Sequence, residues 1–241
     1  MTTYLALHYW AGSGREYDLL PPLLPSGCRL LAPSLPGFGD QAVPAGFDYS
    51  VASYADWLAG YIAEQQLDDY QLIGHSMSGK VAMLLAARQP AGLRGLLLLS
   101  PSPPTPEPIS DDDRAASLAA YGQPAEAEKT FTKITSIPLS EQEHRQVVED
   151  NLRTTRAAWD EWLLRGSRED ISAHMPRIAV PCRLLVGEND RAIPPAAQRQ
   201  QTLPLLPAGS AMVVVPGAGH LLPLEAPEEI FKGQHASSLA E

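Results

Sequence analysis

Six short runs of apolar residues recur along the chain, each bounded by glycine, proline or a polar turn residue. Most of them lack the alternation of apolar and polar positions that is typical of a sheet with one solvated face. We therefore predict six buried, mostly parallel strands at residues 4–7, 29–32, 71–73, 95–99, 183–186 and 212–215. Helical patterns alternate with these runs, which indicates an α/β fold with helices on both faces of the sheet.

Two of the helical patterns flank the third strand. Residues 50–66 begin at Ser50, a favourable N-cap, and place Tyr54, Leu58 and Ile62 at helical spacing. Residues 79–89 follow the third strand after a short glycine-containing segment, and Pro90 ends the pattern. The third strand is therefore expected to turn sharply into a helix.

The connection between the fourth and fifth strands is far longer than one crossover helix requires. It begins with a proline-rich stretch at residues 101–108, which is predicted to be extended. Helical patterns follow near residues 124–134, 140–151 and 153–165. We interpret residues 101–176 as a helical lid, or cap, and residues 1–100 and 177–241 as the core to which it is attached.

The segment between the third strand and its helix, residues 74–79, reads Gly-His-Ser-Met-Ser-Gly and contains a G-x-S-x-G core. This core also arises by chance in ordinary turns. Between a strand and a helix, however, it is typical of a sharp turn that exposes the serine hydroxyl above the sheet. The N–H groups at the start of the following helix point to the same place. These features favour Ser76 as a nucleophile.

A serine nucleophile needs a base, and the base needs an acid that orients it. Asp190 follows the fifth strand and His220 follows the sixth, so both are expected beside Ser76 at the carboxyl ends of parallel strands. Its position favours Asp190 over other carboxylates such as Glu188. Of the remaining histidines, we expect two to be packed and hydrogen-bonded, His8 and His75, and three to lie at the surface, His144, His174 and His235.

The motifs of this chain resemble those of the α/β-hydrolase superfamily, close to its small bacterial esterases and lactonases. Besides the Ser76 segment, the resemblance rests on Leu-His-Tyr-Trp at residues 7–10, Pro-Ser-Leu-Pro-Gly-Phe-Gly at 33–39, Gly-Glu-Asn-Asp at 187–190 and Gly-Ala-Gly-His at 217–220. It implies that Ser76 is the nucleophile, that His220 is the general base and then acid, and that Asp190 orients His220.

The resemblance also suggests where an oxyanion hole would lie. One backbone N–H is expected from Met77, which directly follows the nucleophile. The family takes the second N–H from the residue after a His-Gly pair, and that residue is Trp10 in this chain. Tyr9 stands where the family usually has glycine, and its ring is a candidate for the substrate pocket.

Two tryptophans share one face of the predicted lid helix at residues 153–165. Trp159 and Trp162 are three positions apart, so their side chains lie on the same side. The pattern favours packing of the lid against itself or the core. The alternative is that both rings line the acyl or alcohol pocket.

Composition narrows the possible partners. The 241 residues carry a formal net charge of −10, which argues against nucleic acids and anionic membranes. The two cysteines, Cys28 and Cys182, start apolar runs and are interpreted as buried thiols. No metal-ligand spacing and no dinucleotide fingerprint occurs, so neither a metal nor another cofactor is expected. Without a recognisable signal peptide, the protein is expected to be cytoplasmic. A monomer and a homodimer are equally compatible with the sequence.

The predicted function is a serine hydrolase that cleaves a small carboxylic ester or lactone through an acyl-enzyme on Ser76. Hydrolysis of a C–C bond or a thioester, and haloperoxidase- or perhydrolase-type chemistry, would use the same triad and stay open. A further alternative is a hydrolase-like receptor that binds a ligand with little turnover. Serine at position 76 argues against relatives that use a carboxylate nucleophile.

Overall fold

The computed structural model describes residues 1–232, which contain a six-stranded sheet in the order β2-β1-β3-β4-β5-β6. Every pair of neighbouring strands is parallel, so the predicted six-stranded parallel α/β fold is confirmed. The strands are β1 (Thr3–Leu7), β2 (Arg29–Leu31), β3 (Tyr70–His75), β4 (Leu93–Leu99), β5 (Cys182–Gly187) and β6 (Ala211–Val215). All six carboxyl ends therefore meet at one edge of the sheet.

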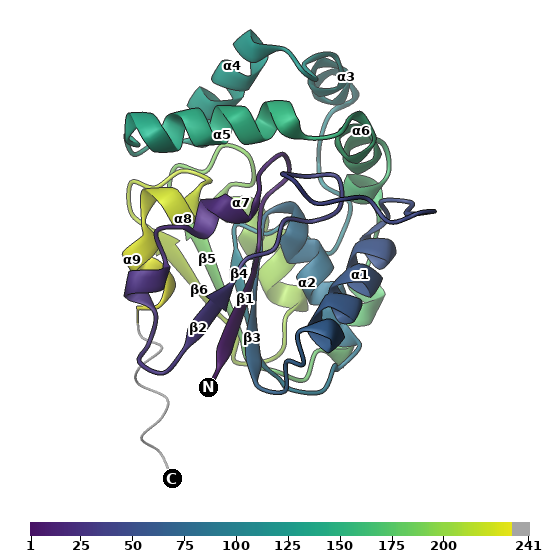
Figure 1. Cartoon of the computed structure of the whole chain (residues 1–241), viewed down its shortest axis with the longest axis vertical. Coiled ribbons are helices and arrows are strands. Elements are labelled where there is room, and N and C mark those ends of the chain that lie inside the picture. The colour runs from purple at the N-terminus through teal and green to yellow at the C-terminus, as the bar shows by residue number, and fades with distance from the viewer. Residues whose placement is uncertain (233–241) are drawn as a thin grey trace.

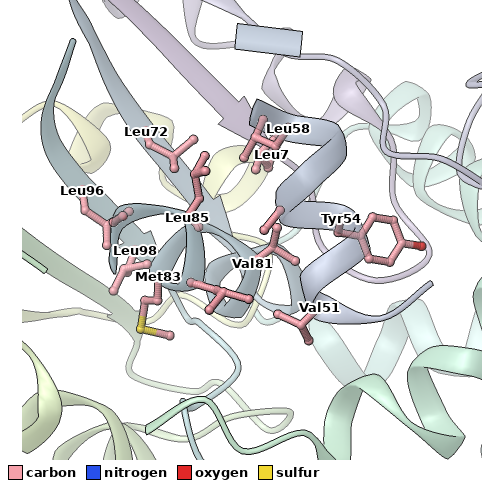
Figure 2. Packing of buried hydrophobic residues seen from close by; sticks show 14 of the residues in the cluster. Leu7, Val51, Tyr54, Leu58, Leu72, Val81, Met83, Leu85, Leu96 and Leu98 are labelled. Atoms are coloured by element: carbon pink, nitrogen blue, oxygen red, sulfur yellow. The ribbon is translucent and has the colours of Figure 1, made fainter. Parts of the chain in front are cut away.

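Helices cover both faces of this sheet because alternate side chains of each buried strand point to opposite sides. On one face, α1 (Val51–Glu64) and α2 (Met77–Ala87) pack their apolar side chains against Leu7, Leu72 and Leu98, as Figure 2 shows. The opposite face, with Ile73 and Leu99, packs against the C-terminal helices. Those helices are α8 (Leu222–Glu225) and α9 (Pro227–Ile230).

The two edge strands are covered less completely than the sequence pattern predicts. Arg29 in β2 is exposed, and its neighbours Leu30 and Leu31 are only partly buried. In β6, Val215 is the buried residue, whereas Ala211 is exposed. The prediction of full burial was wrong for these strands because an edge strand has a hydrogen-bonded neighbour on one side only.

A layer of four helices lies over the carboxyl ends of the strands (Figure 1). It consists of α3 (Asp111–Ala119), α4 (Pro124–Ile134), α5 (Glu141–Arg153) and α6 (Arg156–Leu164), and we call it the helical cover. The sequence pattern gave no prediction for α3. Its start carries a recognisable signal, because the Ser110 side chain accepts a hydrogen bond from the Asp113 N–H at 3.1 Å.

Lys80, in α2, ties both ends of the long connection to the core. Its Nζ is fully buried and donates to the carbonyl oxygens of Thr105 at 3.1 Å and Glu169 at 2.9 Å. Burial lowers the pKa of this amine to about 8. The segment that leads into the helical cover and the segment that leaves it are thus held by one side chain.

Short helical turns complete the described chain. They comprise α7 (Pro195–Ala197), the π-helical turn at Gln198–Thr202 and the 3-10 turns at Gly14–Tyr17, Pro21–Leu23, Gly166–Arg168, Ser172–Arg177 and Leu203–Leu205. Each helix within residues 1–232 is too short or too polar to cross a lipid bilayer.

Candidate active site

Ser76 occupies a strained turn between β3 and α2. Its backbone angles are φ 52° and ψ −120°, a conformation that residues with a side chain rarely adopt. The turn is held by hydrogen bonds from the Ser76 N–H to the Leu99 carbonyl at 2.9 Å and from the Ser102 N–H to the Ser76 carbonyl at 2.8 Å. The neighbouring β4 and the chain after it thus fix the serine in this conformation.

The two glycines that flank the serine permit close contact between the strand and the helix. A Cβ atom at Gly74 would lie 2.8 Å from the Cβ of Ala82, and one at Gly79 would lie 2.5 Å from the Cβ of Pro101. Both distances are shorter than van der Waals contact. Only glycine at these positions lets α2 begin this close to β3 and to the residues after β4.

Asp190 and His220 are joined by a hydrogen bond in a buried setting. Oδ2 of Asp190 lies 2.8 Å from Nδ1 of His220, and the two side chains are 0% and 4% exposed. The other carboxylate oxygen accepts the N–H groups of Ala192 at 2.8 Å and Ile193 at 2.9 Å. The aspartate therefore has a fixed orientation and holds the imidazole with its Nε2 free for another partner.

This contact shifts both ionisation equilibria. Burial disfavours the imidazolium, but Asp190, together with the charges of Glu16 and Glu107, raises the pKa of His220 above its ordinary value. Burial likewise disfavours the carboxylate, but His220, together with the hydrogen bond from the Ile193 N–H, lowers the pKa of Asp190. The pair is thus stabilised as carboxylate and imidazolium.

The three residues follow three different strands, with Ser76 after β3, Asp190 after β5 and His220 after β6. Ser76 and His220 line the same cavity. Within residues 1–232, the Ser76 hydroxyl makes no hydrogen bond to His220 or to another residue. In unliganded active sites, hydrogen bonds between catalytic side chains are often long and tighten when substrate binds.

The cavity has a volume of about 370 Å³ and lies between the sheet edge and the helical cover. The core contributes Tyr9 and Trp10 to its wall together with Ser76 and His220. The cover contributes apolar side chains, which are Phe131, Ile134, Val147, Trp159, Trp162 and Leu163. A cavity of this size and polarity suits a small organic molecule.

The backbone N–H groups of Met77 and Trp10 both lack a hydrogen-bond partner in the part of the chain that the structure describes. Met77 is the first residue of α2, where the N–H groups of a helix have no partner within the helix. Tyr9 keeps a negative φ, and the positive φ in this loop falls on Ala11 at 66°. The tyrosine therefore replaces glycine without backbone strain.

Trp159 and Trp162 pack between the helical cover and the core, and both line the cavity. Trp159 packs on the Trp10 ring, with centroids 4.2 Å apart, and donates from Nε1 to the Ser117 carbonyl at 3.0 Å. Trp162 belongs to the main core, where the Lys80 Nζ lies 5.9 Å from its ring centroid. Both rings hold the helical cover on the core and also line the cavity.

Glu225 links the loop that carries His220 to the helical cover. Its Oε1 accepts N–H groups from Ser136 and Ile137, at 2.6 and 2.8 Å, in the connection between α4 and α5. The same carboxylate accepts the N–H of Gly219 at 3.1 Å and that of Leu221 at 3.0 Å. One side chain thus holds four backbone donors from two separate segments.

The other histidines have different surroundings. His8 is fully buried, with Nδ1 2.7 Å from the Tyr9 carbonyl and Nε2 accepting the Leu35 N–H at 2.9 Å. His75 is also fully buried and hydrogen-bonded. His174 is exposed, whereas His144 is partly buried by stacking on Phe131. His235 lies outside the described residues.

Cys28 and Cys182 are both free thiols, and only Cys182 is fully buried. The expectation of burial was therefore wrong for Cys28, which is partly exposed beside the edge strand β2. In residues 1–232 no three His, Cys, Asp or Glu side chains are arranged to hold a metal ion.

The sequence alone did not identify four charged residues of this region. They are Glu16, Lys80, Glu107 and Glu225, and each is buried or lines the cavity. Lys80 carried a recognisable signal, because it is the one charged side chain in the apolar pattern from residue 79 to residue 87. The three glutamates carried none, since their partners are distant in sequence.

Comparison with known proteins agrees with this architecture. The sequence model described as the alpha/beta hydrolase family matches residues 5–232. The chain is 28% identical over 224 residues to pimeloyl-(acyl-carrier protein) methyl ester esterase from Neisseria meningitidis, covering 89% of this chain and 84% of that protein. It is 27% identical over 240 residues to a putative 2-succinyl-6-hydroxy-2,4-cyclohexadiene-1-carboxylate synthase from Bacillus subtilis, covering 92% and 85% of the two chains.

Among solved structures, an esterase from Exiguobacterium antarcticum superposes with a TM-score of 0.86 at 18% identity. The match covers 98% of this chain and 91% of that one. At this identity the superposition establishes a shared fold.

Proposed function

Since the chain belongs to the alpha/beta hydrolase family, we propose that it is a serine hydrolase that cleaves a small carboxylic ester or lactone. The observation that carries the proposal is the strained Ser76 on the wall of a cavity that it shares with His220. The hydrogen bond between His220 and Asp190 supports it, because it leaves the second imidazole nitrogen free to act as a base.

In the proposed reaction, the Ser76 Oγ attacks the substrate carbonyl carbon while Nε2 of His220 takes the hydroxyl proton. The carbonyl oxygen becomes an oxyanion, and the unpaired N–H groups of Met77 and Trp10 stabilise it. The tetrahedral intermediate collapses, His220 gives its proton to the leaving alkoxide, and an acyl-enzyme forms. Water then attacks the acyl carbonyl carbon while Nε2 of His220 takes one of its protons. The second tetrahedral intermediate collapses, His220 gives that proton to the Ser76 Oγ, and the carboxylic acid is released.

Asp190 keeps Nδ1 of His220 protonated, so Nε2 is the nitrogen that can accept the Ser76 proton. Because it favours the imidazolium, it also stabilises the charge that His220 acquires when it takes the proton. We further propose that residues 101–176 act as the lid and that Tyr9, Trp159 and Trp162 form part of the substrate pocket. The lid and its aromatic side chains would exclude water and set the size of the acyl group.

A panel of substrates tests the reaction class. We expect short-chain p-nitrophenyl esters or a γ- or δ-lactone to be hydrolysed faster than the matching thioester. A spectroscopic or pH-stat assay measures these rates. Rapid labelling of Ser76 by a fluorophosphonate would show an activated nucleophile. Rapid labelling without turnover of any panel member would instead favour a ligand-binding protein or a different reaction, such as C–C bond hydrolysis, and would contradict the ester assignment.

The position of Glu107 leads us to predict which acyl groups of the panel are preferred. Glu107 lines the cavity, and burial raises the pKa of its carboxyl, so negative charge is already disfavoured there. A second carboxylate in the same cavity would add charge repulsion to this cost, whereas Lys133 and Arg191 at the wall are exposed and screened by water. We expect the methyl ester of a monocarboxylic acid to be cleaved faster than the monomethyl ester of a dicarboxylic acid of similar length.

The variant Glu107→Gln should reduce the ratio of the two kcat/KM values by about tenfold, which corresponds to the loss of about 1.4 kcal/mol of charge repulsion. The matched control is Asp113→Asn, which removes an exposed carboxylate from the same cavity wall and should change the ratio less than about twofold. An unchanged ratio in Glu107→Gln would show that Glu107 does not select the acyl group.

A further inference from the structure

Glu16 and His75 form a buried pair directly behind the candidate active site. Glu16 lies in the 3-10 turn Gly14–Tyr17, and His75 is the last residue of β3, next to Ser76. Their side chains are 3% and 0% exposed, and Nδ1 of His75 lies 3.2 and 3.3 Å from the two Glu16 carboxyl oxygens. Neither residue belongs to the triad.

The second nitrogen of His75 connects this pair to His220. Nε2 of His75 lies 2.8 Å from the backbone carbonyl oxygen of His220. A carbonyl oxygen only accepts hydrogen bonds, so Nε2 carries a hydrogen and donates it. Nδ1 therefore shares a proton with Glu16, and this contact fixes the plane of the His75 ring. The ring in turn fixes the main chain of His220 through the hydrogen bond to its carbonyl oxygen.

The Glu16 carboxylate also reaches the loop of the candidate oxyanion hole. Its Oε2 accepts the N–H of Tyr9 at 3.4 Å, and the Tyr9 carbonyl is held by Nδ1 of His8 at 2.7 Å. The Tyr9 carbonyl and the Trp10 N–H belong to one planar peptide group. Fixing Tyr9 on both sides therefore fixes the direction of the Trp10 N–H.

We propose that Glu16 and His75 are positioning residues. Through the Glu16 carboxyl group, they fix the general base His220 and the oxyanion-hole loop relative to each other. The inference rests on the proposed function for the identity of those two parts. Stability alone gives a weak reason for such a pair, because apolar side chains of similar volume often stabilise a core as well as a buried ion pair does. The role must therefore be tested by catalysis.

The negative charge of Glu16 provides a second readout. Besides Asp190, the Glu16 and Glu107 carboxylates contribute to the raised pKa of His220, and the His75 ring lies 5.0 Å from its ring. Removing the Glu16 charge should lower the pKa of His220. The acid limb of kcat/KM, where His220 becomes protonated and stops acting as a base, should then move to lower pH. A purely structural side chain would leave this limb unchanged.

The test compares the wild type with Glu16→Gln and His75→Gln, which keep hydrogen-bonding side chains of similar length. We expect kcat for a p-nitrophenyl ester to fall about 10- to 100-fold, with KM within about threefold, because misplaced catalytic groups slow the chemical step. The rate of fluorophosphonate labelling should fall in parallel. In Glu16→Gln the acid limb should also shift. The double variant should lose little more than one single variant.

The matched control is Glu128→Gln. Glu128 pairs with His144 at 2.6 Å between Oε2 and Nε2, and this contact has the same chemistry on the exposed surface of the helical cover. It should change neither kcat nor the pH profile. NMR titration of the His220 ring protons measures its pKa without turnover, so it decides the inference even if the ester assignment fails.

Two results would overturn the inference. One is a folded Glu16→Gln or His75→Gln protein with wild-type kcat and labelling rate. The other is an unchanged His220 titration in Glu16→Gln. If one of the two variants does not fold, the other one decides. A wild type that fluorophosphonate does not label would contradict the proposed function separately.

Discussion

A Ser76→Ala variant is expected to lose kcat/KM for ester hydrolysis by about 10,000-fold or more, because it lacks the hydroxyl on which the proposed acyl-enzyme forms. Its stability should stay within about 0.5 kcal/mol of the wild type, since the Ser76 hydroxyl makes no hydrogen bond in residues 1–232 that the substitution would remove. Steady-state kinetics and thermal unfolding of the same preparation measure both quantities.

Ser117→Ala is the matched control, because Ser117 is a second serine on the cavity wall and lies in α3. It should keep its activity within about threefold. Ser76→Ala with more than about 1% of wild-type kcat/KM would contradict the assignment of Ser76 as nucleophile. Loss of folding in Ser76→Ala would instead show that the strained turn depends on the hydroxyl.

The second large effect is expected at Gly187, the last residue of β5. A Cβ atom there would lie 1.9 Å from the carbonyl oxygen of Gly219 and 2.5 Å from that of Ala218. Gly187→Ala must therefore push apart the loops that carry Asp190 and His220. We expect a loss of about 3 kcal/mol or more in the free energy of unfolding, which corresponds to a fall of about 6–12 °C in Tm.

Activity should fall with stability at this position. A displacement of about 1 Å between catalytic groups costs about 100-fold in rate, and the folded fraction of Gly187→Ala should show a loss of this order. Gly60→Ala is the control, because no atom lies within 4 Å of its added Cβ in the exposed part of α1. That substitution should raise stability by about 0.5–1 kcal/mol. A Gly187→Ala protein as stable as Gly60→Ala would contradict the prediction, because it would show that the two loops move apart without a cost in stability.

The sequence predicted those parts of the fold that depend on local pattern. Buried strands such as β3 and β4 contain short apolar runs, and helices such as α1 begin after an N-cap serine. The edge strand β2 has a similar pattern but is only partly covered, because coverage depends on the neighbours of a strand and not on its own residues. The helix α3 was missed although Ser110 caps it, because its nine residues carry few apolar positions.

The candidate site also contains some residues that the sequence could predict and others that it could not. Ser76, Asp190 and His220 stand directly after strands, so the sequence could bring them to one edge of the sheet as soon as the strands were placed. Glu16 contacts His75 across 59 positions of sequence, and Glu225 contacts Ser136 across 89. Such pairs depend on how loops pack in three dimensions, which no local spacing encodes. These contacts became visible only in the structure.

The four N–H groups that Glu225 receives make the loop of His220 and the connection between α4 and α5 one mechanical unit. The His220 N–H strengthens this unit by donating to the Ile134 carbonyl at 2.8 Å. An opening that swung α4 outward would therefore carry the histidine away from Ser76. A route past the opposite side of the cover, where α3 and α6 pack together, would leave His220 in place. A chimera that exchanges the helical cover would need to take residues 134–137 and the loop of His220 from the same parent protein.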